Sequence, residues 1–349
     1  MVPRRRSSTR RLSARPHAEV ILGCLLLALW VAATLPPLSA QAADDPVVAF
    51  QSRPHQVLVT IAGQPIATYV SKDDAISRPY FAHVRAPGGI QVTRNHPPIE
   101  GQDPTDHPEY HPGIWMAFGD ISESDYWRLK APVLHQGFVE EPSGGPGEGG
   151  FAVLNRYVAE GEPSKTVCEE IARYTFRVTP SGYLLEWDST FSADAAGAPF
   201  YFGDQEEMGI GFRIASPMYV EPPRKDKNAP PGNGKIVDSK GRKNESEIWG
   251  NAANWVDYSG TIAGKHAGIT LICHPGNFRP SWLHTRDYGV ITVNPFGREA
   301  FGKGDKSKVV VRPGERLRLR YGVLLHADPP DSRPDLAAAY AEYIRLTGE

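Results

Sequence analysis

The stretch Arg316-Leu317-Arg318-Leu319-Arg320-Tyr321 alternates charged and apolar residues with a period of two. Successive side chains of a strand point to opposite faces, so the leucines lie on one face and the arginines on the other. The apolar pattern continues to Leu325, and the turn-forming residues Arg312-Pro313-Gly314-Glu315 separate it from Val309–Val311. This stretch therefore predicts a strand with one buried face, preceded by a tight turn.

Similar short runs recur along most of the chain. They are Gln56–Ile61, Ile66–Val70, Phe81–Arg85, Ile90–Thr93, Val133–Val139, Phe151–Ala159, Glu170–Val178, Tyr183–Phe191, Gly209–Ile214, Gly268–Cys273 and Val290–Val293. The 34 glycines and 32 prolines among 349 residues favour many turns and exclude a helical bundle. We predict an all-β fold, a large β-sandwich, with residues 43–349 as a single domain.

One C-terminal helix interrupts this pattern. Pro334 suits its first turn, Gly348 suits its C-terminal cap, and apolar residues recur between them at helical spacing. Two loops stand out by composition, residues 143–150 and residues 221–235, which are rich in Gly and Pro. We interpret both as excursions from one domain.

The first 42 residues have the pattern of a secretory signal peptide. Six arginines precede an apolar run from Val20 to Leu35, and small residues follow at positions 39–43. An uncleaved membrane anchor is the alternative, but the apolar run is shorter than the roughly 20 residues that span a bilayer. We predict cleavage after Ala42 and a periplasmic or secreted mature protein that has left the membrane.

Composition narrows the functional classes. Removal of residues 1–42 takes away six Arg and one Glu, which leaves 32 basic and 39 acidic residues, a net charge of −7. Such a chain is poorly suited to neutralising phosphates, so we expect no nucleic-acid partner. No Cys-x-x-Cys is present, which argues against iron–sulfur and Cys-rich zinc sites. The remaining Cys168 and Cys273 predict either one disulfide or two buried thiols.

Histidine, carboxylate and aromatic residues gather in three clusters. The first runs from 94 to 127, where histidines next to prolines indicate loops. Aromatic rings stack on sugar rings and polar groups bind hydroxyls, so this mixture is typical of a sugar site, although His and Asp also ligate metals or anchor loops. The candidates here are Arg94, Asn95, His96, His107, His111, Trp115 and Asp120.

The second cluster holds Glu206 and Glu207, of which only one can point into a site from a strand. The third contributes His274, Asn277, Trp282, His284, Arg286 and Asn294. We predict His107, His111, His284 and Glu207 as acids or bases and the others as binding residues. Solvated charges and core aromatics are the alternative interpretation. Motifs of the common serine hydrolases, nucleotide-binding proteins and zinc proteases are missing.

Several of these strings together resemble the exported bacterial proteins labelled PmoA family, or "methane oxygenase PmoA". The resemblance covers roughly residues 55–327 and rests on Arg78-Pro79-Tyr80-Phe81, Asp106-His107-Pro108, His111-Pro112-Gly113-Ile114-Trp115, Glu206-Glu207-Met208-Gly209 and Arg286-Asp287-Tyr288-Gly289. It implies a secreted β-sandwich from sugar-degrading bacteria, with a size similar to the galactose mutarotase-like supersandwich. Taken literally, the label implies a metal-dependent oxygenase.

The leading hypothesis is an exported β-sandwich that binds a carbohydrate and acts on it, as a lyase, epimerase or hydrolase, by His/Glu acid–base chemistry. The alternatives are a non-catalytic module that binds carbohydrate or protein and, disfavoured, a metal-dependent oxygenase. We expect the three clusters to meet in one cleft and to need neither a metal nor another cofactor. The sequence indicates no oligomeric state.

Overall fold

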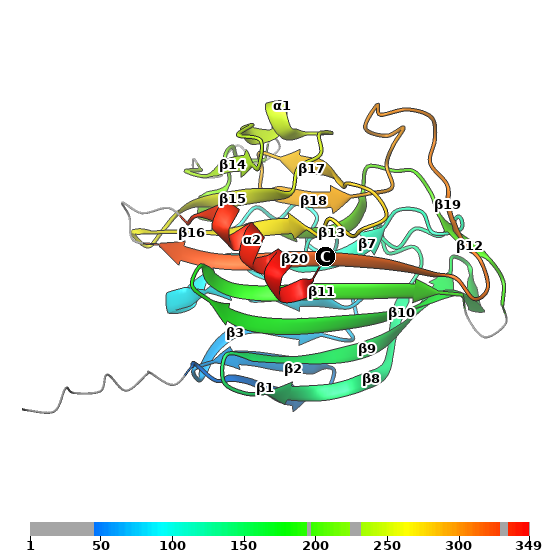
Figure 1. The fold of residues 1–349 in the computed structure, drawn as a ribbon, viewed down its shortest axis with the longest axis horizontal. Coiled ribbons are helices and arrows are strands. Elements are labelled where there is room, and N and C mark those ends of the chain that lie inside the picture. The colour runs from blue at the N-terminus through cyan, green and yellow to red at the C-terminus, as the bar shows by residue number, and fades with distance from the viewer. Residues whose placement is uncertain (1–44, 194–196, 224–231, 329–333, 349) are drawn as a thin grey trace, which may run out of the picture. The chain divides into compact units, whose positions relative to one another are not determined.

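A computed structural model describes residues 45–193, 197–223, 232–328 and 334–348. The predicted signal peptide, residues 1–42, lies outside these described residues. Residues Asp44–Glu349 form one compact unit. Two eight-stranded antiparallel sheets pack face to face in it (Figure 1), so the predicted all-β sandwich is confirmed.

The first sheet has the strand order β1 (Val48–Arg53), β2 (Gln56–Ile61), β3 (Gln64–Val70), β4 (Tyr80–Ala82), β7 (Ile114–Phe118), β13 (Met208–Arg213), β18 (Val290–Asn294) and β17 (Trp282–Arg286). The second has the order β14 (Lys235–Asp238), β15 (Trp255–Ile262), β16 (Lys265–Cys273), β20 (Arg316–Asp328), β11 (Gly182–Ser192), β10 (Glu162–Thr179), β9 (Glu148–Ala159) and β8 (Val133–Gly144).

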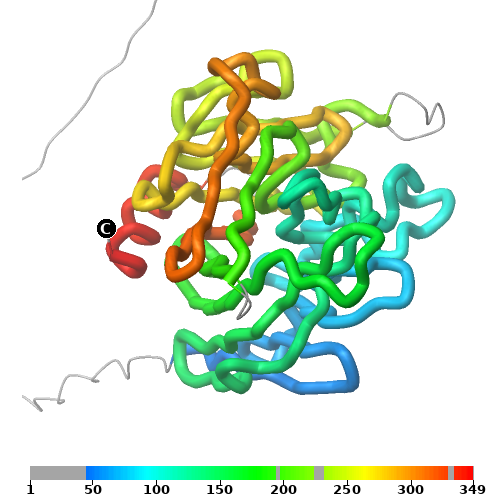
Figure 2. The backbone as a smooth tube through the Cα atoms, turned by 90° about the vertical axis from the view of Figure 1, so that its right-hand side faces the viewer, coloured from blue at the N-terminus to red at the C-terminus, as the bar shows by residue number. Residues whose placement is uncertain are grey.

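Short elements complete the described chain. The two-residue strands β5 (Arg85–Ala86) and β6 (Ile90–Gln91) form a hairpin around η1 (Pro87–Gly89). The strands β12 (Phe200–Phe202) and β19 (Val309–Val311) pair with each other, and their segments run side by side in Figure 2. The helices are η2 (Ser216–Met218), α1 (Asn244–Ile248) and α2 (Leu336–Thr347).

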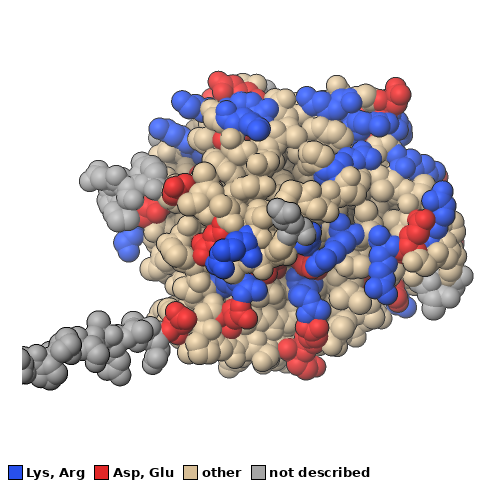
Figure 3. Space-filling model, in the orientation of Figure 1, with Lys and Arg blue, Asp and Glu red and all other residues tan. Residues whose placement is uncertain are grey.

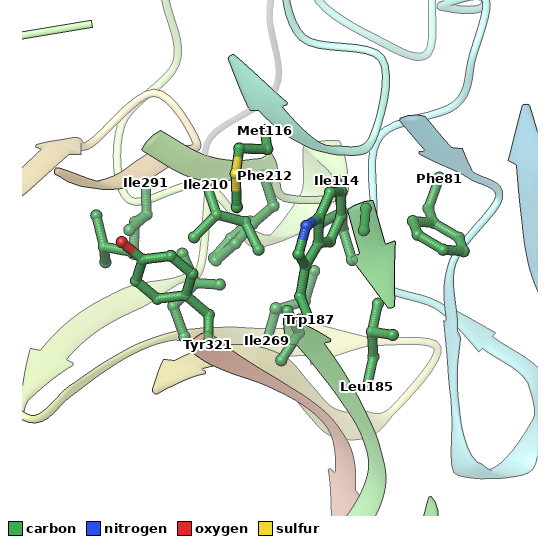
Figure 4. Packing of buried hydrophobic residues seen from close by; sticks show 14 of the residues in the cluster. Phe81, Ile114, Met116, Leu185, Trp187, Ile210, Phe212, Ile269, Ile291 and Tyr321 are labelled. Atoms are coloured by element: carbon green, nitrogen blue, oxygen red, sulfur yellow. The ribbon is translucent and has the colours of Figure 1, made fainter. Parts of the chain in front are cut away.

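The core lies between the two sheets (Figure 4). Phe81, Ile114 and Phe212 from the first sheet face Trp187 and Tyr321 from the second, and all five are at most 3 % exposed. Each buried large apolar side chain contributes about 1.5–3 kcal/mol to folding, so this layer supplies the main driving force. In β20, the buried leucines and exposed arginines alternate as predicted.

The predicted C-terminal helix is present as α2, on the outer face of the second sheet. Ala339 and Tyr343 pack against Leu184, Ile272 and Leu324. The side chain of Asp335 accepts a hydrogen bond from the N–H of Ala338, which caps the start of the helix, and Gly348 ends it with φ of 71°.

Some local predictions differ from the structure. Residues 143–150 belong largely to the β8–β9 hairpin, and their glycines serve close packing, since a Cβ on Gly144 would lie 2.0 Å from the carbonyl oxygen of Val48. The strand β19, which precedes the predicted turn at residues 312–315, pairs with β12, since both edges of β20 are occupied, by β16 and β11. Cys168 and Cys273 are buried thiols and form no disulfide. Within the described ranges, no helix is long and apolar enough to span a bilayer.

Candidate functional site

A cleft of about 560 Å³ opens beside the outer face of the first sheet, the face that does not contact the second sheet. The loop before β7, the segment after η2, the helix α1 and the turn between β17 and β18 surround it. Its lining residues are Asp106, His107, Glu221, Pro222, Pro223, Glu245, Ser246, Arg286, Asp287 and Tyr288. The first and third sequence clusters therefore meet here, through His107 and Arg286.

The histidine loop is held in place by the buried side chain of Arg94. The guanidinium donates to the carbonyl oxygens of Pro104 and Asp106 at 2.9 and 2.8 Å, and to those of His107 and His111 at 3.3 and 3.4 Å. Burial, and after it the charge of Arg213, lowers the pKa of Arg94 to about 9, so the group stays protonated at neutral pH. Arg94 is thus engaged with the loop backbone, and we assign it no direct ligand contact.

The carboxylate of Asp106 is fixed by a second buried arginine, Arg213 at the end of β13. Its two terminal nitrogens donate to the two Asp106 oxygens at 3.0 and 2.9 Å, and its Cζ lies 5.0 Å from the centre of the Tyr288 ring. A bidentate pair of this kind restricts the carboxylate to one orientation. Arg213 therefore presents both Asp106 and Tyr288 to the cleft.

His107 and His111 lie next to each other in very different surroundings. His107 is exposed at the cleft, with a backbone φ of 48°, and its ring centre lies 5.4 Å from that of His111. His111 is buried and stacks on Trp115 at 5.1 Å. Burial, then the charges of Arg213 and Arg94, holds the pKa of His111 well below its usual value. Its imidazole is therefore neutral near pH 7, which argues against the predicted role as a general acid.

The strand β17 contributes Trp282, His284 and Arg286 on one face, as its alternation requires. Arg286 donates to Glu245 at 3.0 Å and to Glu206 at 3.4 Å. Glu207 pairs instead with Arg128. Neither of the two adjacent glutamates lines the cleft. Glu206 contacts the lining residue Arg286, and the predicted acid–base role of Glu207 is not supported by its position.

His284 is almost fully buried in β17. Burial, and after it the charge of Arg286, lowers its pKa to about 3, so it is also neutral near pH 7. Its Nδ1 has no hydrogen-bond partner among the described residues. A neutral buried imidazole can orient a hydroxyl group, but it cannot donate the proton of a cationic acid.

His284 belongs to a row of polar groups across four strands. In register, His284 pairs with Thr292, Thr292 with Gly211 and Gly211 with Trp115. Thr292 Oγ1 and Trp115 Nε1 also have no partner within the described part of the chain. A Cβ at Gly211 would lie 2.7 Å from Thr292 Oγ1, so glycine leaves the space in front of the hydroxyl open. Buried polar groups rarely stay unpaired, so this row offers hydrogen bonds behind the cleft.

At the cleft wall, the carboxylates of Asp287 and Glu245 each accept a hydrogen bond from the backbone of the other residue. Glu245 N–H donates to Asp287 Oδ1 at 2.9 Å, and Asp287 N–H donates to Glu245 Oε2 at 3.1 Å. Burial, then the charges of Glu245 and Glu221, raises the pKa of Asp287, and this outweighs the opposing hydrogen bond from Glu245. A carboxyl group whose pKa is raised is suited to proton donation.

Three predicted binding residues serve the fold instead. The side chain of Asn294 donates to the carbonyls of Gln205 and Glu206 and accepts from two backbone N–H groups, which fixes the glutamate loop. Asn277 exchanges two hydrogen bonds with the backbone of Arg320. His274 contacts the carbonyl of Gly348 at 2.8 Å, at the end of α2. Asn277 and His274 thus belong to the second sheet, away from the cleft.

The remaining candidates lie near the first sheet but do not line the cleft. Asn95 donates to Asp103 at 2.9 Å, His96 contacts the hydroxyl of Tyr80 at 3.1 Å, and Asp120 accepts from the backbone of Glu123. Trp282 packs 6.2 Å from the ring of Phe301. These side chains already have partners within the protein, so we interpret their contacts as stabilising the loops.

Sequence reasoning missed six charged or aromatic side chains of this site, namely Asp106, Arg213, Glu221, Glu245, Asp287 and Tyr288. Asp106 and Asp287 directly adjoin the predicted His107 and Arg286 in the sequence. The two motifs were therefore identified, but their aspartates were not predicted as site residues. Glu245 carried no signal, because it pairs with Asp287 from 42 positions away.

The fold and the cleft together give a two-sheet β-sandwich with an exposed candidate site on one side. Residues 56–342 match the family of unknown function DUF6807, and the chain belongs to this family. No curated protein matches the chain.

Among solved structures, the chain is similar to a GH36 alpha-galactosidase from Geobacillus stearothermophilus (11% identity, TM-score 0.38), covering 80% of this chain and 41% of that one. A galactose mutarotase-like protein from Lactobacillus casei has 12% identity and a TM-score of 0.32, with 80% of this chain and 100% of that one covered. The Slr1438 protein from Synechocystis has 11% identity and a TM-score of 0.30, with coverages of 82% and 97%. The chain thus spans less than half the length of the galactosidase.

Proposed function

We propose that this protein binds a neutral carbohydrate in the cleft and acts on it by acid–base chemistry. The observation that carries the proposal is the convergence of His107, Asp106, Arg286 and Tyr288, from segments about 180 residues apart, on one cleft. The two prolines and the tyrosine ring offer apolar surface for a sugar ring, and the carboxylates accept hydrogen bonds from its hydroxyls.

The charge of the lining supports a neutral ligand. Among the described residues, four carboxylates line the cleft, from Asp106, Glu221, Glu245 and Asp287, against the single guanidinium of Arg286. Arg286 is already paired with Glu206 and Glu245. An anionic sugar would meet repulsion from these carboxylates, whereas hydroxyl groups would find acceptors.

The acid–base part of the proposal rests on Asp287 and His107. Asp287 has a raised pKa and lies in the lining, so it is the candidate acid, and the exposed imidazole of His107 is the candidate base. These roles replace those first expected of His111, His284 and Glu207.

Binding without turnover is the second candidate function. It is favoured by the burial of His111 and His284, whose imidazoles are neutral, and by the pairing of Glu207 with Arg128. Three of the four acid–base residues expected from the sequence are therefore engaged elsewhere or unable to supply a proton near pH 7.

Export forms part of the proposal. The Arg-rich start, the apolar run and the small residues before position 43 support a cleaved signal and a periplasmic or secreted protein. The resemblance to the PmoA-labelled proteins supports the same compartment.

The test is calorimetric titration of the purified protein with neutral oligosaccharides and with their uronic-acid counterparts. We expect binding of a neutral sugar, about tenfold or more weakened in His107→Ala and in Arg286→Gln, since each removes a lining group. Arg312→Gln, which alters an exposed arginine of the 312–315 turn, is the matched control and should bind normally.

Asp287→Asn separates the two candidate functions. If the cleft is catalytic, this variant retains binding and loses product formation, as measured by chromatography of the incubated sugar. Equal binding by the wild type and all cleft variants, or preference for the uronic acids, would refute the proposed site. Binding with no product from the wild type would leave the non-catalytic function.

A further inference from the structure

Two histidines and an aspartate meet on the outer face of the second sheet, the opposite side of the sandwich from the cleft. His266 lies in β16, and His326 and Asp328 lie two residues apart in β20, so the alternation of the strand places both on one face. His266 is the direct cross-strand partner of Asp328. The three side chains are therefore held by regular sheet geometry and not by a loop.

The spacing of their polar atoms matches that of metal ligands. Asp328 Oδ2 lies 3.2 Å from Nδ1 of His326 and 3.4 Å from Nδ1 of His266. One ligand atom from each residue fits within 4.8 Å of the others, and no other such group occurs in the described part of the chain. Ligands at about 2.0–2.1 Å from a tetrahedral zinc ion lie about 3.3 Å apart.

A further carboxylate orients His326. Asp257 in β15 lies 2.9 Å from His326 Nε2, and it also accepts hydrogen bonds from Thr270 at 2.8 Å and Ser259 at 2.7 Å. Metal-binding histidines commonly hold their second nitrogen against a carboxylate, which fixes the ring orientation. Here that contact turns Nδ1 of His326 toward Asp328 and His266.

The surroundings admit the His326 ring and leave the edge of the group partly exposed. Gly268 lies opposite His326, and a Cβ there would come within 2.7 Å of the imidazole Nε2, so glycine is needed to admit the ring. His326 is fully buried, whereas the Asp328 side chain is 15 % exposed and that of His266 is 9 % exposed. Solvent reaches the group from the side of Asp328, where a water ligand can complete the coordination.

We propose that His266, His326 and Asp328 bind a zinc ion, with Asp257 as the carboxylate that orients His326. Two imidazoles and one carboxylate are ligands that zinc accepts readily, and three protein ligands with a water is the arrangement of zinc sites with an open position. The two aspartates balance the double charge of the ion. This site is separate from the carbohydrate cleft, so it does not alter the expectation that the cleft works without metal.

The experiment is zinc titration of tag-free, chelator-treated protein at pH 7.5, with a chromophoric chelator as competitor. We expect one zinc per chain in the wild type, and at least about 100-fold weaker binding in Asp328→Asn and in His266→Gln. Asp257→Asn should retain the stoichiometry and lose about 10- to 100-fold in affinity, as second-layer carboxylates do. Magnesium should not compete, because it prefers oxygen ligands.

His135→Gln is the matched control, since His135 is a partly buried histidine in β8 of the same sheet and should not affect zinc binding. Circular dichroism on every variant identifies loss of folding. Cobalt bound in place of zinc should give the strong visible absorption of a tetrahedral site in the wild type and lose it in Asp328→Asn. Absence of stoichiometric zinc, or zinc binding unchanged in folded Asp328→Asn and His266→Gln, would overturn the proposal.

Discussion

At the scale of single residues, burial decides which polar groups can do chemistry. Arg94 and His111 are residue types that are common in binding sites. However, Arg94 donates hydrogen bonds to loop carbonyls, and His111 stacks on Trp115. The sequence suggests that His111→Ala leaves the fold intact. Its burial changes that expectation, because truncating a buried ring costs stability. His107, being exposed, remains suitable for an alanine test of binding.

The pH dependence of stability provides a test at this scale. The folded pKa of His284 is about 3, below its unfolded value near 6.5. Between these values the unfolded chain binds more protons, so the stabilisation is full above pH 6.5 and is lost as the pH falls toward 3. His284→Gln should reduce this slope by up to about 1.4 kcal/mol per pH unit.

The measurement is urea unfolding of the wild type and His284→Gln at several pH values between 4 and 7. His55→Asn, which changes an exposed histidine, should keep the wild-type slope. Identical slopes in the wild type and His284→Gln would show that His284 titrates normally in the folded protein.

At the scale of elements, the strands and the loops contribute different groups to the cleft. The ends of β13 and β17 supply Arg213 and Arg286, and the irregular segments bring Asp106 and Glu245 to them. The strands thus fix the positions of the two guanidinium groups, and the loops supply the carboxylates that pair with them. On the second sheet, the adjacent strands β15, β16 and β20 supply the His and Asp group directly.

The helix α2 offers a prediction at this scale. Tyr343 is 1 % exposed, and its ring lies over Gly322 of β20, where a Cβ would approach within 3.0 Å. Tyr343→Ala should cost about 3–5 kcal/mol, because it removes the main contact of the helix with the sheet. Urea unfolding measures the loss. Arg345→Ala, on the exposed side of the same helix, is the control and should change stability by less than about 0.5 kcal/mol. Equal stability of both variants would show that α2 does not depend on Tyr343.

At the scale of the whole molecule, the two sheets have different outer faces. The second presents paired charges, such as Arg318 with Asp188 and Arg177 with Glu186, and Lys and Arg side chains lie among Asp and Glu on this face (Figure 3). The outer face of the first sheet is apolar around Trp115 and Trp127 and is covered by loops. The cleft lies beside this covered face, and the proposed zinc group lies on the charged one.

Export is a prediction about the whole chain. Expressed from the full sequence in a bacterial host, the protein should appear outside the cytoplasm and begin near Ala43, because the small residues before that position suit signal cleavage. N-terminal sequencing of the exported fraction checks this. Exported protein that retained residues 25–35 would contradict cleavage, and an Ala40→Leu, Ala42→Leu variant should remain unprocessed.

The sequence by itself determined the strands, the sandwich and the C-terminal helix, because alternation and helical periodicity are local properties that burial of one face requires. It also indicated that residues 94–120, 204–209 and 274–294 carry the polar chemistry. Tertiary structure decided which of those residues line the cleft. Some polar side chains of these clusters are suited to ligand binding but already form hydrogen bonds with backbone groups that are distant in the sequence. They are Asn277, His274 and Asn294. The raised pKa of Asp287 also depends on tertiary structure, because it comes first from burial and then from the charge of Glu245, 42 residues away in the sequence.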